Sequence, residues 1–122
     1  MSVNKTQSAP REITLRRWRV IEIELPGGVR SRHVWGHDAE KNAGRASSAI
    51  ETFDKETLVA TTRSGSTYRL TGLPGNSRLG KSAWNDWCKE SKVVSECDVT
   101  HEYLDVNKIS TVGFERLKHN VL

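Results

Sequence analysis

Residues 12–25, EITLRRWRVIEIEL, restrict the fold more than any other segment, because their pattern is that of a long β-strand. From Ile21 to Leu25, apolar residues alternate with glutamates, which is the period of a strand with one buried face. Trp18 and Val20 lie earlier in the segment and fall on the opposite parity. We therefore expect a β-bulge, or a change of buried face, near Arg19.

Turn sequences divide the next fifty residues into shorter β-type runs. Pro26-Gly27-Gly28 reverses the chain, and Ser64-Gly65 supplies a tight hairpin turn in which glycine tolerates positive φ. In the hairpin, Tyr68 and Leu70 are expected to face inward. Residues 38–45 read as a polar loop. The strands expected after the first are Val29–His37, Ala46–Phe53, Leu58–Arg63 and Ser66–Thr71.

A helix is predicted over residues 82–91, SAWNDWCKES, with Ser82 as its N-cap. Its apolar residues fall on one helical face and its charged residues on the other. Residues 99–103 alternate like a further strand. Residues 109–121 have the apolar spacing of a short C-terminal helix.

Together these elements predict an α+β fold, with about five antiparallel strands in a curved or barrel-like sheet and one or two packed helices. We expect residues 1–10 to be a disordered tail and residues 11–122 to form a single domain. No segment has the roughly 20 apolar residues of a membrane span, and the N-terminus has no secretory apolar region. We therefore expect no membrane association and a cytoplasmic location.

The segment from Gly75 to Ser82, GNSRLGKS, matches the phosphate-binding pattern G-x-x-x-x-G-K-S. In a true P-loop, Lys81 would contact the β- and γ-phosphates, and Ser82 would hold Mg²⁺. However, the preceding STYRLTGL is not a continuously apolar strand, and no later strand ends in a clear Walker-B aspartate. The context favours a chance match. Arg78, Lys81 and Ser82 remain candidates for binding an anion at a helix N-terminus.

The basic residues carry most of the functional information. The net charge is +4, and the first fifty residues, with nine basic and five acidic side chains, hold the whole excess. Arginine suits bidentate contacts to phosphates or carboxylates, and a tryptophan among arginines can stack on a base. If the first two strands pair, their arginines are expected to cluster. The predicted contact residues are Arg16, Arg17, Trp18, Arg19, Arg30, Arg32, Arg63 and Arg69.

Catalytic and metal-binding patterns are weak by comparison. Cys88 lies on the apolar face of the predicted helix, and Cys97 lies between two acidic residues that oppose thiolate formation. His33 and His37 are four apart on a strand, which separates them by roughly 13 Å. The spacing of the two cysteines fits no common zinc motif. We therefore predict no enzymatic activity, no cofactor and no metal.

The run VWGHDAEKNAGRASSAIETFD…TTRSGSTYRLTGLPG…WNDW, within residues 34–87, resembles small uncharacterised bacterial proteins of phage and mobile-element type. Its motifs are GRASSAI, a TRSG-x-x-YRL hairpin, G-x-PG and W-x-x-W. The resemblance implies action by binding host machinery, including anti-CRISPR-like inhibition. It transfers no catalytic residue.

The leading hypothesis is a non-enzymatic protein that binds nucleic acid or a nucleoprotein complex through an arginine-rich β surface. The first alternative is an inhibitor of a host defence complex, such as an anti-CRISPR, whose arginines meet an acidic protein surface. The second alternative is nucleotide binding by Gly75–Ser82. The sequence does not indicate an oligomeric state.

Overall fold

The structure, a computed structural model, describes residues 11–104. The expected tail at 1–10 and the expected helix at 109–121 lie outside this range. The described elements are β1 (Glu12–Glu24), β2 (Arg30–Asp38), β3 (Ala43–Ala46), β4 (Ile50–Asp54), β5 (Val59–Thr62), β6 (Thr67–Thr71), α1 (Arg78–Ser91), β7 (Ser95–Asp98) and a 3₁₀ helix (Thr100–Tyr103).

The sheet is organised around β1, which has three neighbouring strands. β2 runs antiparallel along one edge of β1. On the other edge, β6 pairs in parallel with the first half of β1, and β7 pairs antiparallel with the second half. The remaining order is β3-β2-β1-β6-β5-β4, so β3 and β4 are the two ends. The α+β class is confirmed, but the sheet has seven strands, is mixed and is not closed.

The prediction of about five antiparallel strands in a barrel-like sheet was therefore only partly correct. The parallel pair between β1 and β6 joins residues more than fifty positions apart, which no local periodicity reveals. Part of the expected loop at 38–45 forms the short strand β3 instead. The expected strand at 46–53 begins only at Ile50, as β4.

A β-bulge in β1 supplies the expected change of parity. The pairing register with β2 shifts between Arg16 and Arg19, and Arg17 has a left-handed φ of 49°. Beyond the bulge, Val20 points into one core and Ile21 into the other. The strand is thus buried on both faces, whereas the sequence pattern predicted one buried face with a bulge or a change of face near Arg19.

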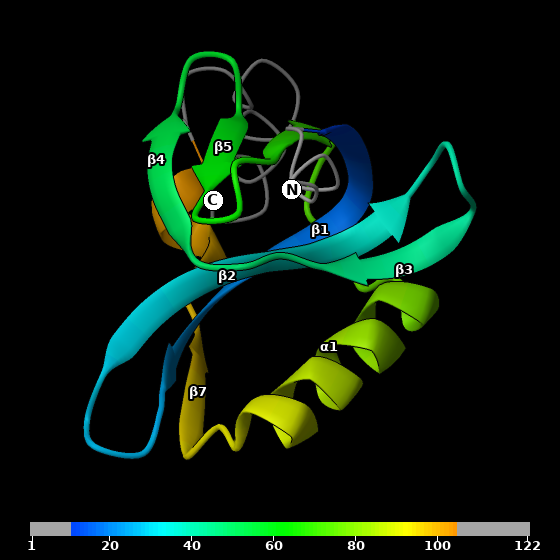
Figure 1. Cartoon of the computed structure of the whole chain (residues 1–122). Helices are drawn as coiled ribbons and strands as arrows, with labels where there is room; N and C mark the ends of the chain where they lie inside the picture. Colours follow the sequence, from blue (N-terminus) through cyan, green and yellow to red (C-terminus); the bar gives the residue numbers. More distant parts are fainter. Residues whose placement is uncertain (1–10, 105–122) are drawn as a thin grey trace, which may run out of the picture.

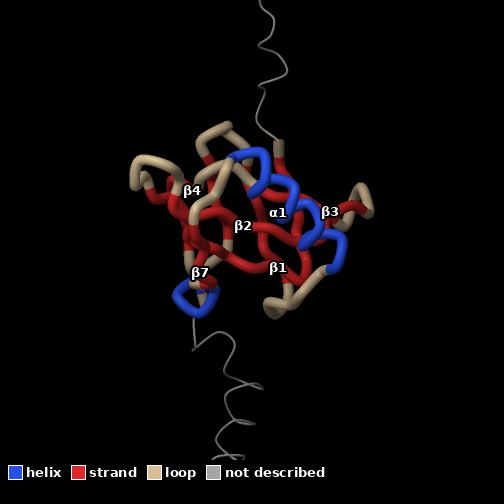
Figure 2. Tube along the Cα trace, turned by 90° about the horizontal axis from the view of Figure 1, so that it is seen from below, coloured by secondary structure: helices blue, strands red, loops and turns tan. Residues whose placement is uncertain are grey.

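The two cores lie on opposite faces of the β1–β2 ribbon. In Figure 1, β4 and β5 lie above this ribbon and α1 lies below it, and Figure 2 shows α1 lying across the strands from the other direction. The upper core includes Leu15, Trp18 and Tyr68. The lower core packs Trp35 of β2 against Trp84 of α1. Both layers thus contain fully buried aromatic side chains, which remove large apolar areas from water.

The helix α1 begins four residues before the predicted start. Ser77 is the N-cap, because its hydroxyl oxygen accepts a hydrogen bond from the Gly80 amide at 2.9 Å. Ser82, the expected cap, lies inside the helix on its exposed side. At the other end, Lys92 adopts a left-handed conformation and its amide bonds the last carbonyls, which terminates the helix.

The expected strand at 99–103 is a 3₁₀ helix instead. The Asp98 carboxylate accepts a hydrogen bond from the Thr100 amide at 2.9 Å, which turns the chain at the end of β7. The Thr100 hydroxyl oxygen accepts a hydrogen bond from the Val20 amide at 2.9 Å and anchors the 3₁₀ helix to β1. The Val99 amide still donates to the Val20 carbonyl, but a side-chain oxygen takes the place of the backbone carbonyl that a strand would offer to the Val20 amide.

Candidate anion-binding site

Four of the seven predicted arginines are engaged in ion pairs. The register of β1 and β2 sets Arg30 opposite Glu24 and sets Arg32 opposite Glu22. Arg32 Nε lies 2.9 Å from one oxygen of Glu22, and Arg30 Nη1 lies 3.0 Å from the other. Both hydrogen bonds lower the pKa of Glu22 below its ordinary value of 4.5, and the bond from Arg32 has the larger effect. Both arginines are therefore ion-paired with glutamates of the neighbouring strand.

The other two paired arginines also meet acidic side chains of neighbouring strands. Arg69 of β6 bonds the carboxylate of Glu12 on β1 at 2.6 Å. Arg19 lies 3.7 Å from Asp98 of β7. Four of the arginines that were predicted to form a binding surface are thus ion-paired with acidic residues of neighbouring strands.

The predicted arginines do not gather on one surface. Arg30 and Arg32 lie near the turn at 26–28, whereas Arg16 lies toward the other end of the same hairpin. Arg63 is exposed beside the Ser64-Gly65 turn and forms no ion pair within residues 11–104. Trp18 has no exposed surface, because it is packed in the upper core, and so has no ring face to offer to a base.

Arg16 and Arg17 remain, and they line a small hollow together with His37. We call these three residues the basic hollow, whose volume is about 170 Å³. Arg16 is paired across the strands with His37. The bulge leaves Arg16 and Arg17 both exposed, although consecutive strand residues ordinarily point to opposite faces. Neither arginine forms an ion pair with any residue of the described chain.

The N-terminus of α1 lies beside this hollow. The Ser77 amide donates a hydrogen bond to the Arg17 carbonyl at 3.4 Å, so the N-cap and the bulge are in contact. A helix N-terminus carries a partial positive charge from its free amides. Asp38 follows His37 in the sequence, and its carboxylate points into the next turn. There it accepts hydrogen bonds from the amides of Glu40 and Lys41. The local field therefore favours an anion.

The backbone of Arg17 is in a conformation that non-glycine residues rarely adopt. The loop before α1 supports it: the Gly75 amide donates to the Trp18 carbonyl at 3.3 Å, and Gly75 lies against the Arg17 side chain. A Cβ on Gly75 would come within 3.2 Å of three Arg17 atoms. Unusual backbone conformations of this kind persist at ligand sites more often than elsewhere.

The P-loop-like segment has packing roles in this fold. Gly80 contacts Gly36 of β2, and its amide is already used by Ser77. The Lys81 ammonium lies 5.6 Å from the centre of the Trp35 ring. The helix α1 already begins at Arg78, the fourth position of the motif, whereas a P-loop wraps phosphates with loop amides before its helix begins. The segment lacks that cradle, although Arg78, Lys81 and Ser82 are all exposed.

His33 and the cysteines do not form a second site. His33 is buried, and its Nδ1 donates to the Ser47 carbonyl at 2.9 Å, while Nε2 lies 2.7 Å from the Ser31 hydroxyl. Burial raises the pKa of the Cys88 thiol to about 11, with Glu96 adding to the shift. Within residues 11–104, no group of three or more His, Cys, Asp or Glu is arranged to hold a metal ion.

Sequence reasoning missed the part that His37 plays, since it treated this residue only as a possible metal ligand. Its pairing with Arg16 follows from the hairpin register, which depends on where the bulge lies.

Neither helix among residues 11–104 has the length and apolarity needed to cross a lipid bilayer. Comparisons with protein-family models, curated proteins and solved structures found no match to this chain.

Proposed function

We propose that the protein is a non-enzymatic binding protein that contacts the phosphate backbone of nucleic acid, free or within a nucleoprotein complex, through the basic hollow. The observation that supports this most is the pairing state of the arginines. Arg19, Arg30, Arg32 and Arg69 each have an acidic partner. Of the predicted arginines without one among the described residues, Arg16 and Arg17 lie side by side in one hollow, whereas Arg63 lies apart at a turn. An arginine held without a counter-charge is available for bidentate contact with a phosphate.

Two further features support the same ligand class. The hollow adjoins the N-terminus of α1, whose amides attract anions. Its volume of about 170 Å³ suits a single charged group rather than a whole nucleotide. We therefore propose contact with backbone phosphates, without base stacking, and a preference for charge over sequence.

The test is fluorescence anisotropy of labelled duplex DNA and single-stranded RNA, titrated with protein at low and physiological salt. We pair Arg16→Gln with Arg17→Asn, because asparagine tolerates the left-handed backbone at position 17. The expected result is salt-sensitive binding that this double variant weakens by about tenfold or more. For duplex DNA, the slope of log K against log salt should fall by about 2, one unit for each lost phosphate contact.

The matched control is the double variant Arg30→Gln with Arg69→Gln, which removes the same charge from two ion-paired arginines. It should bind nearly as well as the wild type. Equal weakening by both double variants would mean that only net charge matters, and the hollow would lose its role. If neither nucleic acid binds at low salt, the proposal fails, and an acidic protein surface becomes the partner to test for the same arginines.

A further inference from the structure

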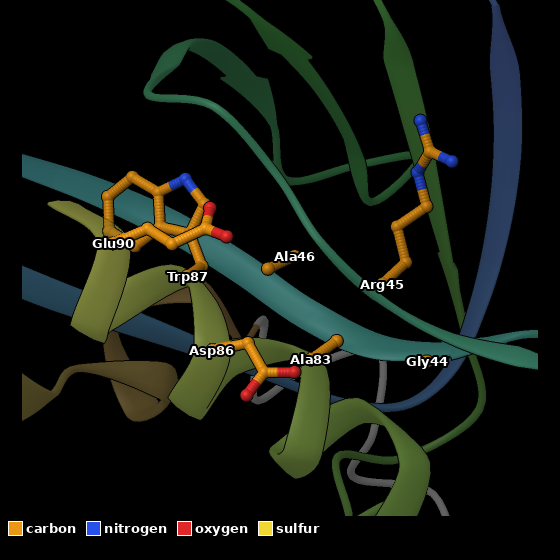
Figure 3. Close-up of a pocket in the computed structure, with 7 residues that line it drawn as sticks. All are labelled: Gly44, Arg45, Ala46, Ala83, Asp86, Trp87 and Glu90. Carbon is orange, nitrogen blue, oxygen red and sulfur yellow. The ribbon is translucent and has the colours of Figure 1, made fainter.

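A second surface lies between strand β3 and helix α1, as the close-up in Figure 3 shows. It is a groove of about 350 Å³, which we call the edge groove. One wall is the end strand of the sheet. The other wall is a single helical stripe with residues at spacings of three and four. The lining residues are Gly44, Arg45, Ala46, Ala83, Asp86, Trp87 and Glu90.

Small side chains create the hollow. Gly44 allows the first turn of α1 to lie directly on β3, since a Cβ there would come within 1.9 Å of the Leu79 carbonyl oxygen. Ala46 and Ala83 then face one another without filling the space between strand and helix (Figure 3). At one end stands Trp87, whose ring stacks on Trp84 with 5.2 Å between centroids. The groove thus has a fixed apolar wall.

The backbone of β3 is available along this groove. β3 is an end of the sheet and pairs only with β2 among the described strands. The Ser47 amide donates to the Val34 carbonyl, so Ser47 and Val34 form a hydrogen-bonded pair. In an antiparallel ladder, hydrogen-bonded pairs alternate with pairs whose backbone groups point away from the partner strand. The amide and carbonyl groups of Ala46 and Gly44 therefore point away from β2. No backbone hydrogen bond within residues 11–104 joins them to another strand.

The charge beside this free edge is acidic. Asp86 and Glu90 are exposed on the α1 wall, and neither forms an ion pair with a described residue. The one basic residue of the lining, Arg45, extends away from the helix in Figure 3, and its Nε donates to the Tyr68 hydroxyl at 3.3 Å. An incoming chain would therefore meet two uncompensated carboxylates.

We propose that the edge groove accepts an extended basic segment of a partner protein, which adds as a further strand beside β3. Strand addition of this kind gains affinity from main-chain hydrogen bonds and specificity from alternate side chains. Every second side chain of the added strand would face α1. A small apolar one fits between Ala46 and Ala83, and a lysine or arginine on either side meets Asp86 or Glu90.

The other end of the sheet, β4, has different surroundings. It pairs only with β5 among the described strands, but the helix beside it is the short 3₁₀ helix, whose Tyr103 ring packs on Phe53 of β4 with 4.8 Å between ring centroids (Figure 1). The edge groove is also separate from the basic hollow, because the two share no lining residue. A protein with both surfaces can hold a basic segment of a partner and a phosphate backbone at the same time.

The test is NMR titration of the whole ¹⁵N-labelled chain with the capped peptide Lys-Thr-Val-Thr-Lys and with its counterpart Glu-Thr-Val-Thr-Glu. The basic peptide should shift the amides of Gly44 and Ala46 and the indole of Trp87, with weak affinity typical of a minimal motif. The acidic peptide should cause no such shifts. The double variant Asp86→Lys with Glu90→Lys should weaken binding by about tenfold or more. The control Glu40→Lys with Glu51→Lys, with the same charge change, should not.

Strand addition has a further signature that simple charge attraction lacks. N-methylation of alternate peptide residues removes donors from one edge of the added strand only. One of the two alternate sets should abolish binding, and the other should leave it intact. The proposal is overturned if both sets behave alike, if the acidic peptide binds equally, if shifts occur elsewhere, or if neither peptide binds. It is also overturned if the same amides shift with protein concentration alone, because a second copy of the chain would then fill the groove.

Discussion

Gly80 of α1 lies directly on Gly36 of β2. A Cβ added to Gly80 would come within 2.6 Å of the Gly36 carbonyl oxygen, closer than real Cβ atoms approach a backbone atom. The helix therefore sits on the sheet at a point where neither side offers a side chain. The second glycine of the P-loop-like segment is accounted for by this contact, without a phosphate.

Gly80→Ala should destabilise the protein by about 1–3 kcal/mol, because the helix must move off the sheet to make room for a methyl group. In an exposed helix the same change would instead stabilise by about 1 kcal/mol. Urea denaturation followed by tryptophan fluorescence measures the difference. Ser82→Ala, at an exposed position of the same helix, should be neutral or slightly stabilising. A gain in stability for Gly80→Ala would show that Gly80 and Gly36 are not in close contact.

Stability should decrease as the pH falls below about 6.5, through His33. Burial, and to a lesser extent the charge of Arg63, lowers the pKa of this histidine below its ordinary value of 6.5. Between the pKa of His33 in the unfolded chain and its lower pKa in the folded chain, the unfolded chain binds a proton that the folded chain does not. The free energy of unfolding therefore decreases as the pH is lowered through this window. Above the unfolded pKa this loss is absent. Thermal denaturation from about pH 7 to pH 5 measures it.

The variant His33→Gln serves as the control for this pH effect. It removes the titrating group while keeping an amide that can donate to the Ser47 carbonyl. Its stability should vary less over the same pH range than that of the wild type. Identical pH profiles for the two proteins would assign the effect to other groups.

The two cysteines should react with a thiol reagent at very different rates. Cys97 is exposed, whereas Cys88 is half-buried with its pKa raised to about 11, so at neutral pH almost none of it is thiolate. One thiol of the folded protein should therefore react rapidly and the second only on unfolding. Absorbance with an aromatic disulfide reagent counts both. Cys97→Ser should remove the fast phase, and persistence of that phase would contradict the assignment.

Thr100→Val should destabilise the protein by about 1–3 kcal/mol, because it leaves the buried Val20 amide without an acceptor. Valine keeps the shape of threonine, so little packing is lost. Thr100→Ser retains the hydroxyl and should recover most of the loss. Chemical denaturation of the three proteins gives the comparison. If valine and serine were equally tolerated, the hydrogen bond would contribute nothing to anchoring the 3₁₀ helix.

Much of the fold could be predicted from local sequence. The two apolar parities around Arg19 indicated a bulge, and the structure has one at Arg17. The hairpin turns at 26–28 and at Ser64-Gly65 were also predicted, because only glycine readily adopts the positive φ found at Gly27, Gly28 and Gly65. Such features depend on residues that are neighbours in the chain, so a single sequence contains the information.

Other features were decided by the tertiary structure. Ser77 and Ser82 can both cap a helix, and the cap in the structure is Ser77, in a helix whose Gly80 lies against Gly36 of a distant strand. The sequence shows how many arginines there are, but not which of them are ion-paired. The strand register pairs Arg30 and Arg32 with glutamates and places Arg16 beside His37. The parallel pairing of β1 with β6 and the free edge of β3 have the same origin. These relationships join residues far apart in the chain, so their energies depend on the assembled sheet and not on local periodicity.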